Sequence, residues 1–125
     1  MAKILIADDQ PYIRALLSKE LAKEDYRVAN SGAVELILEH IKDFRPDVVL
    51  LGLHLENSDS WEILRDIKRK VPGLPVLIYV IKSFDAINSL KQAINEVLDK
   101  KSFMLGKQSL SRFLFKHDPD PVAFG

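Results

Sequence analysis

The stretch KILIADDQP, residues 3–11, joins an apolar run to two acidic residues and a proline. The apolar run, residues 3–7, predicts a β-strand that ends at Asp8 and Asp9. Pro11 suits the first turn of a helix, where a backbone N–H is not needed. A helical stripe then follows at Ile13, Leu16, Leu17 and Leu21. The chain therefore begins with a strand followed by a helix.

Short apolar runs and amphipathic segments continue to alternate along the chain. Further strands are expected at residues 26–29, 48–51, 75–81 and 96–99, each followed by a helix, the last of which ends near His117. Residues 48–51 are continuously apolar, as in a central strand that is buried on both faces. This pattern predicts an α/β fold, a doubly wound five-stranded parallel sheet with helices on both faces.

Length and composition narrow the class of protein. A chain of 125 residues suits one domain at residues 1–117, and two prolines mark residues 118–125 as a tail or linker. Lys plus Arg and Asp plus Glu both number 18, and the zero net charge argues against direct contact with nucleic acid. Without cysteine, disulfides and thiolate sites are excluded. No leader or membrane span is evident, so a cytoplasmic protein without membrane contact is expected.

Polar residues at the predicted strand ends indicate where a site should lie, because ligands of open parallel sheets bind at the carboxyl ends of the strands. The residues expected at this edge are Asp8, Asp9, Gly52, His54, Val80 and Lys100. Two adjacent acids near a lysine from a distant strand suit a divalent cation and a phosphoryl oxygen.

From Lys3 to about Leu114 the chain resembles the receiver domain family of two-component response regulators. The resemblance is carried by KILIADDQPYIRALL, PDVVLLGLHLENSDSWEIL, PVLIYVI and NEVLDKKSF. It implies a flavodoxin-like sheet of five strands in the order 2-1-3-4-5. It also implies two acids that bind Mg²⁺, an aspartate after the third strand that accepts a phosphoryl group from a histidine kinase, and a lysine that stabilises this group.

Part of this site matches the sequence. Asp8 and Asp9 correspond to the acidic pair, and Lys100 corresponds to the lysine, although Lys101 stands where a proline usually follows. With two carboxylates instead of three, the pair is expected to bind Mg²⁺ weakly, as a relic of a metal site, and no cofactor is required. A second interpretation is that Lys100 forms a structural ion pair with Asp8 or Asp9.

The residues of the phosphorylation switch depart from the family pattern. Gly52 stands at the phosphoacceptor position and has no side chain to form an acyl phosphate. Val80 replaces the hydroxyl residue and cannot donate a hydrogen bond to a phosphoryl oxygen. Val97 replaces the switch aromatic and has no ring to relay a movement.

These departures predict an atypical pseudo-receiver, not an enzyme, that acts as a phosphorylation-independent protein interaction module. The expected partner is a histidine kinase, an output domain, another regulator or a second copy of the chain. By resemblance, the partner face is formed by the fourth helix, fifth strand and last helix, with Lys82, Lys91, Lys101 and Arg112 on it. A solvated surface would explain these charges equally well.

The alternative is a receiver phosphorylated at an unconventional acceptor with retained Mg²⁺-dependent phosphotransfer. Asp47 lies five residues before Gly52, about 16 Å away along a strand and at the wrong end of the sheet. Asp59 is better explained as a helix cap, and His54 as a surface residue, than as phosphate carriers. A nucleotide pocket is a third possibility, but no glycine-rich phosphate loop follows any predicted strand.

Overall fold

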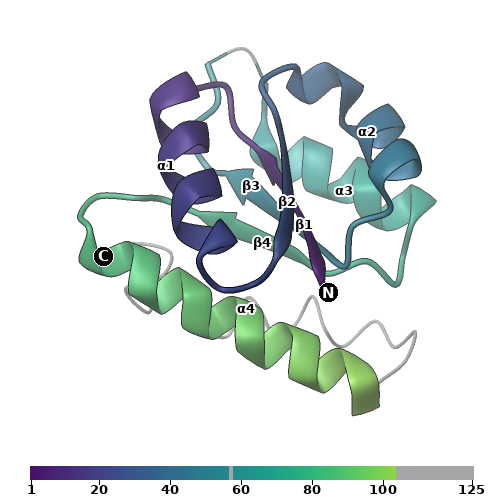
Figure 1. The fold of residues 1–125 in the computed structure, drawn as a ribbon. Helices are drawn as coiled ribbons and strands as arrows, with labels where there is room; N and C mark the ends of the chain where they lie inside the picture. The colour runs from purple at the N-terminus through teal and green to yellow at the C-terminus, as the bar shows by residue number, and fades with distance from the viewer. Residues whose placement is uncertain (57, 104–125) are drawn as a thin grey trace.

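The computed structural model describes residues 1–56 and 58–103, which form a parallel β-sheet covered by helices (Figure 1). The four strands of this part of the chain are β1 (Lys3–Ala7), β2 (Arg27–Ser31), β3 (Val48–Gly52) and β4 (Val76–Tyr79). They are hydrogen-bonded in the order β2-β1-β3-β4, and all pairs are parallel. The predicted order of the first four strands is therefore confirmed.

The helices lie on both faces of the sheet (Figure 1). They are α1 (Pro11–Ala22), the short 3-10 helix η1 (Val34–Leu36), α2 (Ile37–Phe44), α3 (Ser60–Lys70) and α4 (Asp85–Phe103). Alternate residues of each strand face opposite sides, so Leu50 packs in the core under α1 and α4, whereas Leu51 packs in the core under α2 and α3. None of the described helices combines the length and apolarity needed to cross a membrane.

The strand predicted at residues 96–99 is wrong, because these residues belong to α4. The reason is visible in the spacing of Ile87, Leu90, Ile94 and Val97, which continues one helical stripe without interruption. All four side chains are buried against the sheet and α1. Val97 is thus a core residue of a helix. The predicted last helix, the tail at residues 118–125 and Arg112 lie outside the described residues.

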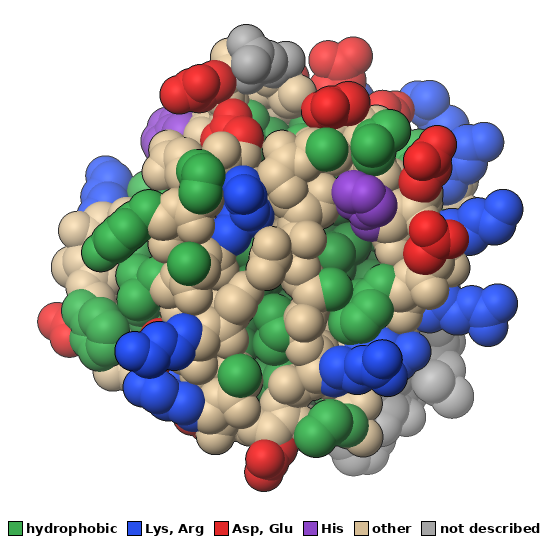
Figure 2. Space-filling view, turned by 45° about the horizontal axis from the view of Figure 1, so that its top comes forward, with side chains coloured by type: hydrophobic (Ala, Val, Ile, Leu, Met, Phe, Trp, Pro, Cys, Tyr) green, Lys and Arg blue, Asp and Glu red, His purple; other side chains and the backbone are tan. Residues whose placement is uncertain are grey.

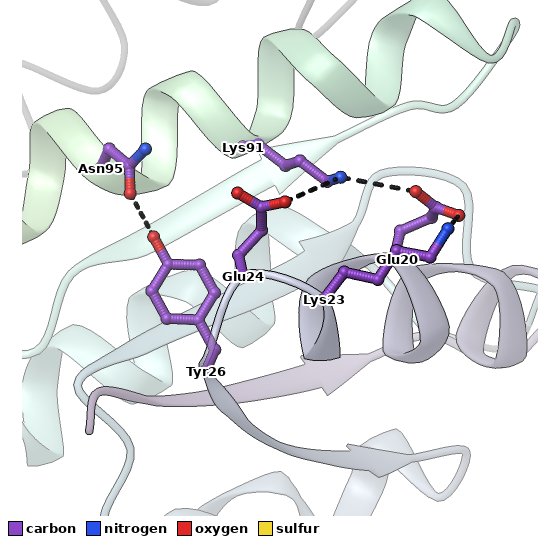
Figure 3. Close-up of polar contacts among 6 residues, drawn as sticks. All are labelled: Glu20, Lys23, Glu24, Tyr26, Lys91 and Asn95. Atoms are coloured by element: carbon purple, nitrogen blue, oxygen red, sulfur yellow. Dashed lines mark hydrogen bonds and ion pairs between the residues drawn. The ribbon is translucent and has the colours of Figure 1, made fainter.

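A network of polar contacts holds α4 against α1 (Figure 3). The Nζ atom of Lys91 lies 3.4 Å from Glu20 Oε1 and 3.5 Å from Glu24 Oε2. Beside it, the Tyr26 hydroxyl donates a hydrogen bond to Asn95 Oδ1. The Lys91 side chain is only 16% exposed, so its charge serves the contact between helices. Its expected place on a partner face stays a prediction.

Replacing Lys91 with Gln should lower the melting temperature, and the loss should shrink in high salt because these ion pairs are partly exposed. Hydrogen bonds from Lys23 and Lys91 lower the pKa of Glu20 below its ordinary value of 4.5. The stabilisation of the fold by the ion pairs of Glu20 is therefore present above about pH 4.5, and it is lost as the pH falls through the folded-state pKa of Glu20. Thermal unfolding of Lys91→Gln at neutral and acidic pH would test this, with exposed Lys19→Gln as the matched control. An equal effect of both variants would contradict it.

Candidate functional site

The carboxyl edge of the sheet brings together Asp8, Gly52 and Tyr79. Strand register places Ala7, the residue before Asp8, opposite Leu51, and places Gly52 opposite Tyr79. Figure 2 turns the top of Figure 1, where β1 ends, towards the viewer. Hydrophobic, acidic and basic side chains are interspersed on the face that it shows.

Asp8 is buried, and each of its carboxylate oxygens accepts a hydrogen bond from the protein. The Tyr79 hydroxyl donates to Oδ2 at 2.6 Å, and the backbone N–H of Gln10 donates to Oδ1 at 2.9 Å. The guanidinium of Arg14 donates to the backbone carbonyl of Asp8 at 2.7 Å. A buried carboxylate needs such donors, because an unpaired one is costly to remove from water.

The Tyr79 hydroxyl is held as a proton donor at this site. Burial is the largest cause that raises the pKa of Tyr79 well above its ordinary value of 10.0, and the neighbouring charge of Asp8 raises it further. The charge of Arg14 acts in the opposite direction without cancelling the shift. Tyr79 therefore remains protonated at neutral pH and supplies the hydrogen bond that Asp8 requires.

At Gly52 any side chain would require the Asp8 carboxylate to shift. A Cβ atom at position 52 would lie 2.8 Å from Asp8 Oδ2 and 3.1 Å from Asp8 Cγ. The backbone carbonyl of Gly52 accepts a hydrogen bond from the Ser60 hydroxyl at 2.6 Å, which ties the end of β3 to the start of α3. The Asp8 carboxylate thus lies directly against the position assigned by resemblance to the phosphoacceptor.

The second acid, Asp9, holds the loop that follows β3. Its Oδ2 atom accepts a hydrogen bond from the backbone N–H of Glu56 at 2.6 Å. Its Oδ1 atom is buried and has no hydrogen-bond partner among the described residues. No group of three or more His, Asp or Glu side chains in the described part of the chain is arranged to hold a metal ion.

The arrangement of Asp8 and Asp9 leaves few carboxylate oxygens without a hydrogen bond for Mg²⁺. This ion demands near-octahedral oxygen coordination and is usually held by one or two carboxylates with waters. Three of the four carboxylate oxygens of the pair already accept hydrogen bonds from the protein. A cation at this pair would share these oxygens with the hydrogen bonds, except at Asp9 Oδ1, which has no partner among the described residues.

Lys100 does not occupy the strand end that the resemblance implies, because it belongs to α4. This helix begins near the carboxyl edge and runs away from it, so that Lys91 already lies beside the last turns of α1. Lys100 follows roughly 22 Å from the start of the helix, at about 1.5 Å per residue. The structure describes only the backbone of Lys100, so its predicted ion pair with Asp8 or Asp9 stays a prediction. Lys101 lies in α4 too, whereas Lys82 is exposed before it.

The remaining predicted residues have ordinary structural places. Asp59 caps α3 by accepting a hydrogen bond from the Trp61 N–H at 2.9 Å, as predicted. Asp47 lies at the opposite end of β3 and accepts a hydrogen bond from the Lys3 N–H. His54 is exposed, and with Val80 it lines a cavity of about 90 Å³ beside Asp8. Ligand pockets usually measure about 300–1,000 Å³, so this cavity is too small for a nucleotide.

Sequence reasoning missed Tyr79 and Arg14. Tyr79 stood in PVLIYVI as one more apolar strand residue, and Arg14 stood on the polar side of a helix. The available signal was the tyrosine itself, because a buried Tyr hydroxyl usually finds a hydrogen-bond partner. Its partner, 71 residues earlier in the chain, could not be identified from local pattern.

Comparison with known proteins supports the family resemblance. The model of the response regulator receiver domain family matches residues 4–106. The chain is 30% identical over 91 residues to sporulation initiation phosphotransferase F of Bacillus subtilis, covering 73% of this chain and 72% of that protein. It is 29% identical over 79 residues to the probable transcriptional regulatory protein TcrX of Mycobacterium tuberculosis, covering 63% of this chain but only 34% of TcrX. The match thus spans about a third of TcrX.

The fold is similar to that of the response regulator TrrA of Thermotoga maritima, solved in complex with Mg²⁺ and BeF. The TM-score is 0.70 at 25% identity, and the match covers 77% of this chain and 98% of TrrA. A second structure of TrrA, in complex with the histidine kinase ThkA, gives a TM-score of 0.69, also at 25% identity, and covers 77% of this chain and 97% of that one.

Proposed function

Because the chain belongs to the response regulator receiver domain family, we propose that it is a pseudo-receiver that works through phosphorylation-independent binding to another protein. The observation that carries this proposal is the absence of a side chain at position 52, beside the Asp8 carboxylate. Position 52 offers no carboxylate nucleophile, and the adjacent Asp8 is hydrogen-bonded to Tyr79 and Gln10. The domain therefore keeps the receiver scaffold for recognition, is not an enzyme and requires no cofactor.

Exposed aromatic side chains support a binding role for the carboxyl edge. Tyr12, Trp61 and Phe84 are 75%, 46% and 61% exposed, and they lie at or just before the first turns of α1, α3 and α4. These helix starts all lie at the edge where the strands end. Aromatic residues are enriched in protein interfaces. This edge is therefore a better candidate for the partner face than the lysines predicted from sequence.

The class of partner follows from the family. TrrA has been solved bound to a histidine kinase, and TcrX is a probable transcriptional regulatory protein about three times as long as the segment that matches. We infer that this chain binds a histidine kinase, an output domain, another regulator or a second copy of itself. In each case binding should not require a phosphoryl group.

Incubation with Mg²⁺ and acetyl phosphate should leave the intact mass of the protein unchanged. Gly52 has no carboxylate, and the Asp59 carboxylate caps α3 by accepting a hydrogen bond from the Trp61 N–H. Sporulation initiation phosphotransferase F, treated in parallel, is the positive control. A phosphoryl adduct on this chain would overturn the proposal. Loss of that adduct in Asp59→Asn, but not in Asp47→Asn, would then identify Asp59 as an unconventional acceptor.

A further inference from the structure

An apolar groove lies at the opposite edge of the sheet from Asp8. It is formed where α2 and α3, which pack side by side on one face of the sheet (Figure 1), both end. Its volume is about 660 Å³, and its floor includes Ile41, Val71 and Leu74. This volume lies within the range of about 300–1,000 Å³ that is typical of small-molecule sites, which are also mainly apolar. The groove is thus far larger than the cavity beside Asp8.

Three cationic side chains and one acidic side chain surround this floor. The cations are Lys42, Arg45 and Lys70, and the acid is Glu39; all four are exposed. None of these three cationic side chains makes a hydrogen bond or an ion pair within the described residues. The rim therefore carries an excess of positive charge next to an apolar surface.

Stabilisation of the helix ends accounts for part of this charge, because Lys42 and Lys70 lie in the last turns of α2 and α3. Basic residues are common in the last turn of a helix because they offset its dipole and bond its free carbonyls. Here the Phe44 carbonyl of α2 already accepts from Lys3 Nζ, and the Ile41 carbonyl accepts from the Arg45 N–H. In α3 the Ile67 carbonyl accepts from the Val71 N–H. The side chains on the rim remain available for another contact.

Arg45 stands where the backbone favours glycine. Its φ of 54° places it in the left-handed region at the end of α2. This conformation costs a residue with a Cβ atom about 1 kcal/mol or more, and glycine is the usual choice at such a helix end. An arginine here projects a charge at the groove in spite of that cost.

The wall of the groove is fixed by the chain itself. Lys68 Nζ donates to the Leu74 carbonyl at 2.7 Å, and the Leu74 N–H donates to the Val71 carbonyl at 3.0 Å. These bonds hold the turn between α3 and β4, which carries two residues of the floor. A preformed site loses less entropy on binding than a flexible one.

We propose that this groove binds an amphiphilic anion, an apolar chain or ring system that carries one carboxylate. The apolar body would cover Ile41, Val71 and Leu74, and the carboxylate would lie among Lys42, Arg45 and Lys70. Charge complementarity selects an anion over a neutral or cationic amphiphile. The volume of about 660 Å³ is in the range of small-molecule sites.

Titration calorimetry with octanoate, decanoate and dodecanoate tests the proposal. Each added methylene should strengthen binding roughly fourfold until the groove is filled. Decanol should bind more weakly than decanoate, and decyltrimethylammonium should bind more weakly still. Absence of saturable binding by decanoate, or equal binding by the cationic amphiphile, would overturn the assignment.

Variants of the rim locate the site. Lys42→Gln and Lys70→Gln should each weaken decanoate binding by about two- to fivefold, whereas Glu39→Gln should strengthen it. Lys19→Gln, an exposed lysine on α1, is the matched control and should have no effect. All four positions are exposed, so the fold should be retained, which circular dichroism would check. Equal effects at Lys19 and Lys70 would overturn the location.

Two further measurements separate the sources of such an anion. Monomeric decanoate should compete with 1-anilinonaphthalene-8-sulfonate for the groove, and vesicles containing phosphatidylglycerol should not bind the protein. Binding to the vesicles without binding to decanoate would indicate a membrane surface and overturn the proposal. Sedimentation velocity showing dimers that Val71→Asp dissociates would mean that a second copy covers the groove, which would also overturn it.

Discussion

Gly52→Asp should lower the free energy of unfolding at pH 7 by roughly 2–4 kcal/mol. The new Cβ atom would meet Asp8 Oδ2 at 2.8 Å, so the Asp8 side chain would have to leave its present position. That movement would break the hydrogen bond from Tyr79. It would also place a second carboxylate beside the first in a buried environment. Urea unfolding monitored by circular dichroism would measure the loss.

Gly52→Ala is the control that separates the steric part of this effect from the charge. It should cost about 1–2 kcal/mol, because it introduces the close contact without a second carboxylate. The additional loss in Gly52→Asp should depend on pH, since two adjacent carboxylates raise one another's pKa. The free energy of unfolding of Gly52→Asp should therefore fall as the pH rises through the raised carboxylate pKa of the folded state. In acid, where that carboxylate is protonated, it should approach the value for Gly52→Ala.

Restoring the aspartate alone should not restore phosphorylation. Asp9 would still be hydrogen-bonded to the Glu56 N–H, and Lys100 would still lie on α4. Intact mass after treatment with Mg²⁺ and acetyl phosphate would test this. A Gly52→Asp protein that is as stable as the wild type and gains a phosphoryl adduct would show that Asp8 moves readily. The pseudo-receiver proposal would then rest on the missing nucleophile alone.

The first four strands could be anticipated because their signals are local, whereas their order was implied by the family resemblance. Residues 48–51 are uniformly apolar, and every residue of β3 is buried. The segment at residues 96–99 was mistaken for a strand because four residues with two apolar side chains fit the periodicity of a strand as well as that of a helix. Only the longer series from Ile87 to Val97 shows that the helical spacing continues. A helix of this length could be recognised only from the whole series.

The site was predicted less well because its contacts join distant parts of the chain. Asp8, Asp9 and Gly52 could be placed at one edge from strand topology alone, and the structure places them there. The hydrogen bond between Tyr79 and Asp8 depends on tertiary packing across β3. The family resemblance drew attention to position 80, whereas the polar group that reaches Asp8 comes from the residue before it.

Tyr79→Phe should lower the free energy of unfolding by about 1–3 kcal/mol near neutral pH, because Asp8 Oδ2 would remain buried without its donor. The substitution keeps the ring and therefore most of the packing in the core under α1 and α4. Urea unfolding should show a lower midpoint with an unchanged m-value, as expected when stability changes but the exposed surface does not. Tyr12→Phe, at a side chain that is 75% exposed, should be neutral.

Tyr79→Phe should also change how the free energy of unfolding depends on pH in alkaline solution. Burial and the charge of Asp8 raise the pKa of Tyr79 well above 10.0 in the folded state. The native state therefore retains a proton that the unfolded chain loses, and the stabilisation is fully present below about pH 10 and declines as the pH rises through the folded value. The difference in the free energy of unfolding between wild type and Tyr79→Phe should therefore become smaller as the pH rises above about 10. Burial also raises the pKa of Tyr26, but both proteins contain Tyr26, so its contribution cancels. A difference that stays constant to high pH would mean that the Tyr79 hydroxyl is not Asp8's essential donor.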